Sequence, residues 1–174
     1  MISRVTTLAL LFTVSRGIFA HSAPQSIVKL DFLEHSIRAE MLVPESELAF
    51  ATAAEPTPLH FEAYLLRHVA ATTPGGETWR VEVRTVRRTT YLDHNYLQAD
   101  VVMTPPAGGS VRHLVFTSDA VTHEVRNHVI VVLARAESGF EVLGALQHPA
   151  RQLTIELRST APVSRVHRAS HALR

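Results

Sequence analysis

Apolar and polar residues alternate along much of this chain, and that pattern constrains its fold more than any other feature. The clearest case is the run from Trp79 to Thr85, where Arg80, Glu82 and Arg84 separate the apolar residues. A period of two predicts a strand with one face in a core and the other in water. The same reasoning predicts further strands at 28–32, 37–43, 97–103, 111–117, 127–136, 140–146 and 152–158.

One segment has helical spacing instead. Thr57 is suited to cap a helix and Pro58 to occupy its first position. Apolar residues recur at helical spacing on one predicted face: Leu59, Ala63, Leu66 and Ala70. A Pro-Gly-Gly turn at 74–76 ends the segment. A shorter helical turn is expected near 45–52. About eight strands and one crossing helix together predict a mainly β protein, an immunoglobulin-like β-sandwich.

The two ends differ from the middle of the chain. Residues 1–20 contain an early Arg4, a short apolar run over 8–14 and Ala20 at a cleavage position, which is typical of a signal peptide. We therefore expect an exported protein, periplasmic or secreted, with a β-sandwich domain at 21–160. Residues 161–174 lose the periodicity and are expected to form a flexible tail or linker stub. No later segment reaches the roughly eighteen apolar residues of a membrane span.

Composition excludes several classes of function. The chain has no cysteine, which excludes disulfides, a thiol nucleophile and cysteine-ligated zinc. Its 17 basic and 16 acidic residues give no positive field for nucleic acid. Gly-x-Ser-x-Gly, the nucleophile motif of many hydrolases, does not occur, and no enzymatic activity is predicted.

Histidines are the main candidate ligands, since the chain contains 11 of them. Cleavage after Ala20 would give His21 a free amine beside its ring, a pair suited to Cu or Ni. His123 and His128 are five residues apart, so a shared ion requires a loop between them, with Asp119 or Glu124 nearby. We therefore name His21, Asp119, His123 and His128 as candidate ligands for divalent Ni, Co or Cu. The alternative is a turn in which Asp119 bonds backbone groups and His128 is a structural strand residue.

Other notable side chains favour structural roles. His60, Tyr64 and His68 fall on one helix face, but the two histidines lie about 12 Å apart along the axis, too far to share an ion. They are interpreted as the border of an amphipathic helix. Trp79 is expected in the core, and the basic cluster 84–88 on a solvated strand face.

The order of several short motifs resembles the extracytoplasmic N-terminal domain of HupE/UreJ-type bacterial membrane proteins. The matching segments cover roughly 22–160: the opening 21–31, Pro44 with Leu48, Tyr64-Leu65, 119–129, 143–146 and Thr154-Ile155. In that family a helical membrane domain follows, associated with nickel or cobalt handling. This sequence stops at Arg174 without such a domain, so the transport role is not carried over.

Two hypotheses follow from the sequence. The first is an exported, non-enzymatic module that acts as a partner or sensor domain at the periplasmic face of a membrane, beside a membrane-protein partner. The alternative is a periplasmic nickel-, cobalt- or copper-binding protein that uses exposed histidines.

Overall fold

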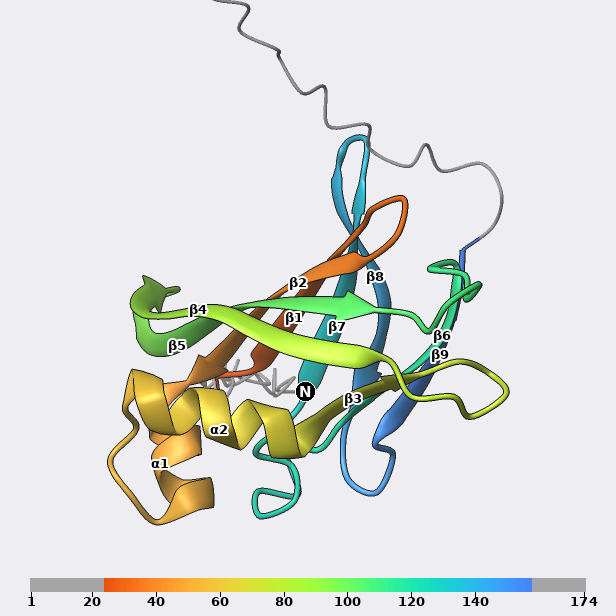
Figure 1. Cartoon of the computed structure of the whole chain (residues 1–174). Helices are drawn as coiled ribbons and strands as arrows, with labels where there is room; N and C mark the ends of the chain where they lie inside the picture. The colour runs from red at the N-terminus through yellow and green to blue at the C-terminus, as the bar shows by residue number, and fades with distance from the viewer. Residues whose placement is uncertain (1–23, 158–174) are drawn as a thin grey trace, which may run out of the picture.

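The computed structural model describes residues 24–157, which form a mainly β structure with two helices (Figure 1). This confirms the predicted fold class at the level of mainly β. The elements, in chain order, are β1 (Ser26–Phe32), β2 (Ile37–Pro44), α1 (Glu45–Thr52), α2 (Pro58–His68), β3 (Val69–Thr72), β4 (Arg80–Tyr91), β5 (His94–Thr104), β6 (His113–Ser118), β7 (Ile130–Ala136), β8 (Gly139–Leu146) and β9 (Gln152–Glu156).

The strands form two sheets. The larger has six strands in the order β4-β5-β2-β1-β7-β8, and the smaller has three in the order β3-β6-β9. All neighbours are antiparallel except β1 and β7, which run parallel, with Ser26 opposite Ile130. A parallel pair needs a long connection between its strands. The whole of β2 to β6 supplies it, and this brings the start of β1 beside the loop that precedes β7.

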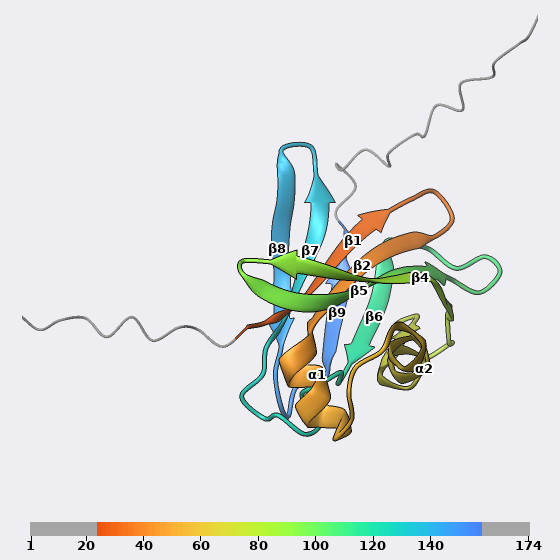
Figure 2. The ribbon, with the colours of Figure 1, turned by 90° about the vertical axis from the view of Figure 1, so that its left-hand side faces the viewer.

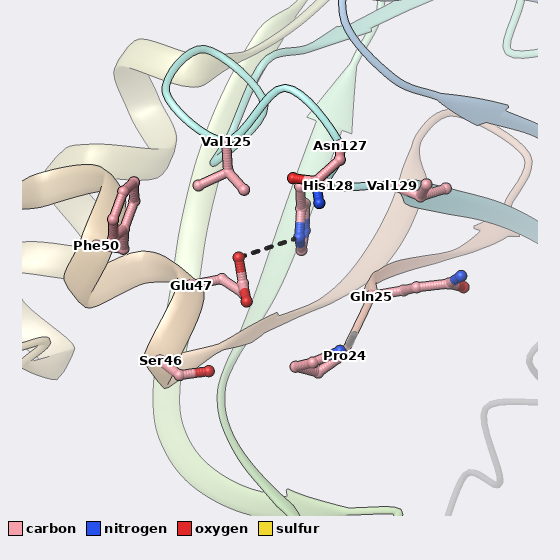
Figure 3. A pocket seen from close by; sticks show the side chains of 9 residues that line it. All are labelled: Pro24, Gln25, Ser46, Glu47, Phe50, Val125, Asn127, His128 and Val129. Atoms are coloured by element: carbon pink, nitrogen blue, oxygen red, sulfur yellow. Dashed lines mark ion pairs between the residues drawn. The ribbon is translucent and has the colours of Figure 1, made fainter. Parts of the chain in front are cut away.

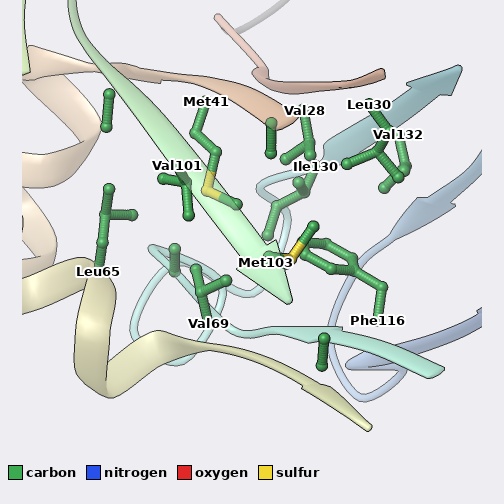
Figure 4. Close-up of a cluster of buried hydrophobic side chains, with 14 of the residues drawn as sticks. Val28, Leu30, Met41, Leu65, Val69, Val101, Met103, Phe116, Ile130 and Val132 are labelled. Carbon is green, nitrogen blue, oxygen red and sulfur yellow. The ribbon is translucent and has the colours of Figure 1, made fainter. Parts of the chain in front are cut away.

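One core is shared by the two sheets and α2 (Figure 4). The inward positions of the period-two strands supply most of it, as the alternation predicts. Its fully buried members include Leu30, Ile37, Met41, Leu65, Leu97, Met103, Leu114, Phe116 and Ile130. Trp79 is only 2% exposed, which confirms its predicted place in the core.

The helices differ from the prediction in number, length and facing. The turn expected at 45–52 is a full helix, α1, so the described residues contain two helices rather than one. Thr57 caps α2 as predicted, because the His60 N–H donates to its Oγ1 at 3.3 Å. The buried face of α2, however, is Phe61, Tyr64 and Leu65, while Leu59 is 76% exposed.

The helix also ends earlier than the Pro-Gly-Gly turn, because residues 69–72 form the strand β3 against β6. The β-branched Val69 and Thr72 favour a strand, and pairing with β6 satisfies the backbone groups of the segment. This ninth strand was missed because four residues are too few to show a period. The strand predicted at Trp79–Thr85 is, in contrast, longer than expected: β4 continues to Tyr91, with a bulge between Val83 and Thr85.

Helix α2 lies across one end of the sheets next to β4, and α1 lies beside it (Figure 2). Within residues 24–157, no helix combines the length and the apolar character needed to cross a membrane. The predicted signal peptide, His21 and the predicted tail fall outside the described residues.

Candidate functional site

The candidate site forms where the end of α2 meets the start of the loop between β6 and β7. His68 is the last residue of α2, and the next residue, Val69, pairs with Ser118 in β6. That register places His68 beside Asp119, whose N–H donates to the His68 carbonyl oxygen at 3.2 Å. Two residues 51 positions apart are therefore neighbours because α2 leads directly into β3.

Three side chains gather at this point: His68, Asp119 and His123. One ligand atom from each lies within 4.8 Å of the others. The Nδ1 atom of His68 is 2.8 Å from Asp119 Oδ1, and the His68 and His123 rings stack with centroids 4.4 Å apart. All three residues are half-buried, so the cluster is open to solvent on one side.

Hydrogen bonds hold each member of the cluster. The Asp119 carboxylate accepts from the His68 ring through Oδ1 and from Arg151 Nη1 through Oδ2, at 2.9 Å. The His123 Nδ1 lies 3.0 Å from the Asp119 carbonyl oxygen, which can only accept, so this nitrogen donates. Such anchoring fixes ring orientation in the way that outer-sphere partners orient metal-binding histidines.

The loop that carries Asp119 and His123 is tightly folded. Its Val121 has a φ of +67°, a conformation that costs a β-branched residue on the order of 1–3 kcal/mol. The Val121 N–H donates to the Tyr64 hydroxyl at 2.7 Å, and its carbonyl accepts from the N–H of Val125 at 2.8 Å. Burial raises the pKa of Tyr64 to about 12, so its hydroxyl stays protonated and uncharged.

His128, at the other end of the loop, lies in a separate environment. Its side chain is buried, and its Nε2 accepts from the Ser26 N–H at 3.2 Å and lies 2.8 Å from Ser26 Oγ. Burial lowers the pKa of His128 to about 4, so the ring is neutral near pH 7. This is the structural role that the sequence analysis gave as its alternative for His128.

The structure therefore brings together two of the four predicted ligands, Asp119 and His123. It places His128 outside their cluster, while His21 lies beyond the described residues. The third member of the cluster is His68, interpreted from sequence as the border of an amphipathic helix because His60, the other histidine of that helix, is too far away to share an ion. The pairing of β3 with β6 would have revealed it, but β3 left no signal in the sequence.

Comparison with known proteins finds no family model that matches this chain and no curated protein that matches it.

Proposed function

We propose that this protein is an exported, non-enzymatic module of immunoglobulin-like β-sandwich type that binds a divalent transition-metal ion through His68, Asp119 and His123. The observation that supports this most directly is the convergence of two imidazoles and one carboxylate within 4.8 Å. The proposal adds Zn to the Ni, Co and Cu inferred from sequence, replaces His128 by His68 and omits His21, which lies outside the described residues.

The cluster needs little rearrangement to hold an ion. Ligands about 2.0 Å from a tetrahedral ion lie roughly 3.3 Å from one another. The nearest pair, His68 Nδ1 and Asp119 Oδ1, is 2.8 Å apart, and the whole set lies within 4.8 Å. The ion would lie between that pair, the proton of the neutral His68 ring would move from Nδ1 to Nε2, and binding should weaken as pH falls because only a neutral imidazole can ligate.

The donor set selects a class of metal. Two imidazole nitrogens and one carboxylate suit Zn, Cu, Ni or Co rather than Mg or Ca, which take oxygen ligands. Three protein ligands on a solvent-facing cluster leave further positions open to water or to a partner's side chain. This is the arrangement expected of a sensor or transfer module, and it agrees with the nickel and cobalt association of the resembled family.

A partner role is supported by exposed apolar side chains. Tyr91 and Leu92 lie at the tip of the β4–β5 hairpin, and Leu92 is 74% exposed. Leu59 exposes comparable apolar surface on α2. We propose that such surface contacts a membrane-protein partner at the periplasmic face, as the resemblance implies.

Calorimetric titration of untagged protein with Ni, Co, Cu and Zn tests the metal site. We expect at least one of these ions to bind with micromolar or tighter affinity, and His68→Ala or His123→Ala to weaken that binding at least tenfold. His60→Ala, a change at an exposed histidine of the same helix, is the matched control and should leave affinity unchanged. Binding that is absent in the wild type, or equal in all variants, would refute the site.

A further inference from the structure

A second site lies at the far end of the same loop. A pocket of about 430 Å³ opens between α1, the start of β1 and the residues before β7 (Figure 3). It is lined by Pro24, Gln25, Ser46, Glu47, Phe50, Val125, Asn127, His128 and Val129. None of the proposed metal ligands belongs to it, so its role is independent of the metal site.

The wall of this pocket holds a histidine with a fixed tautomer. His128 is 3% exposed, and its Nε2 accepts from the Ser26 N–H. An accepting Nε2 on a neutral ring requires that the proton sits on Nδ1. Nδ1 is on the side of the ring that faces Glu47 (Figure 3).

The two polar groups face each other across a gap. The distance from His128 Nδ1 to Glu47 Oε2 is 3.8 Å, too long for a direct hydrogen bond. One group is a donor and the other an acceptor, and both are held by packed elements. An oxygen atom that accepts from Nδ1–H and donates its own proton to the carboxylate completes the pair, and a hydroxyl group does both.

The rim of the pocket suits a ligand with many hydroxyls. Phe50 is 73% exposed, so its ring presents an apolar surface at the opening. Gln25, Asn127 and Ser46 also line the pocket, and their amide and hydroxyl groups can both donate and accept hydrogen bonds. A sugar ring has the complementary character, with apolar C–H faces and a rim of hydroxyls.

We propose that this pocket binds a neutral polyhydroxylated ligand, a sugar or the terminal sugar of a glycan. One ligand hydroxyl bridges His128 Nδ1 and the Glu47 carboxylate, and one face of the ring covers Phe50. An ammonium ligand fits less well, because it offers no acceptor to the Nδ1 proton. A volume of 430 Å³ is within the range of small-molecule sites and has room for one or two sugar rings.

The test is a nuclear magnetic resonance titration of the metal-free protein, with backbone amides as reporters. The probes are D-glucose, D-galactose, D-mannose, N-acetyl-D-glucosamine and myo-inositol, together with the methyl glycosides of the hexoses. We expect at least one to give saturable shifts confined to the pocket, with Gln25, Asn127 and Val129 among them. Equal binding of the methyl glycoside identifies a glycan end, and loss of binding identifies a free sugar.

Variants separate the site from general surface effects. Glu47→Gln should weaken binding roughly tenfold, since it removes a charged hydrogen-bond acceptor. Phe50→Ala should also weaken it, whereas Glu55→Gln and Leu59→Ala, matched changes outside the pocket, should not. The proposal is overturned if no sugar gives saturable shifts, leaving water as the bridging group. It is also overturned if tetramethylammonium or N-methylacetamide binds in place of the sugars.

Discussion

Two histidines of one loop, His123 and His128, have opposite environments. His123 is half-buried and stacks on His68 at a solvent-facing cluster. His128 is buried, bonded to Ser26 and held neutral by a pKa lowered to about 4. The comparison shows that two histidines five residues apart on one loop can differ in their access to solvent and in their neighbours. In the proposed metal site this difference separates His123, a ligand, from His128, a structural residue.

The largest expected effect breaks the buried member of this comparison. His128→Ala removes a buried ring and leaves the Ser26 hydroxyl without its partner, so we expect a loss of about 2–4 kcal/mol in the free energy of unfolding. His123→Ala, at the half-buried end of the loop, should cost less than about 1 kcal/mol. Urea unfolding of both variants measures the difference. Equal losses would mean that the two environments are not distinct.

A second prediction concerns pH. The pKa of His128 is about 4 in the folded protein against 6.5 for the unperturbed group, so below pH 6.5 the unfolded chain binds the additional proton. The stabilisation that the neutral His128 gives to the folded protein is therefore fully present above pH 6.5. Between pH 6.5 and 4 the free energy of unfolding falls by at most about 3 kcal/mol.

Urea unfolding across this range, on the wild type and His128→Gln, isolates the contribution. The wild type should lose more stability than the variant as pH falls. A ring resonance of His128 that titrates near the unperturbed value would contradict the lowered pKa.

The third prediction sharpens the role of the open cluster. An ion present at a hundred times its dissociation constant should raise the free energy of unfolding by about 2.7 kcal/mol, because it binds only the folded state. His123→Gln should abolish that gain, while the pocket variant Glu47→Gln should keep it. Thermal unfolding with and without the ion measures both. A gain retained in His123→Gln would remove this residue from the ligand set.

The smallest effect tests how the loop is held in place. Tyr64→Phe leaves the buried Val121 N–H without its acceptor in a strained conformation, so we expect a loss of about 1–2 kcal/mol in stability. Metal affinity should fall modestly as well, since Asp119 and His123 flank Val121. Unfolding and calorimetry on the variant measure the two effects. An unchanged affinity would show that the loop needs no such anchor.

Much of the fold could be predicted because period two reports directly on one-sided burial. The strand from Trp79 was predicted from strict alternation, and the cap at Thr57 from the chemistry of helix starts. The strand β3 and the buried face of α2 were not predicted, because the local sequence pattern does not determine them. β3 is four residues long, and the buried face of α2 is set by where the sheets lie, not by the most regular apolar spacing.

The candidate site shows the same limit. Asp119 and His123 belong to one turn of chain, so reasoning along the sequence could place them together. His68 is 51 residues from Asp119 and reaches it only through the pairing of β3 with β6. A ligand contributed by tertiary contact leaves no spacing for sequence analysis to detect.

X-ray absorption spectroscopy of the metal-loaded protein tests the central claim most directly, because it identifies the atoms around the ion. With Zn bound, we predict a first shell at about 2.0–2.1 Å that contains two imidazole nitrogens and carboxylate oxygen. In His68→Ala the imidazole contribution should fall to one ring. A shell without imidazole, or one that His68→Ala leaves unchanged, would contradict the assignment of the ion to His68, Asp119 and His123.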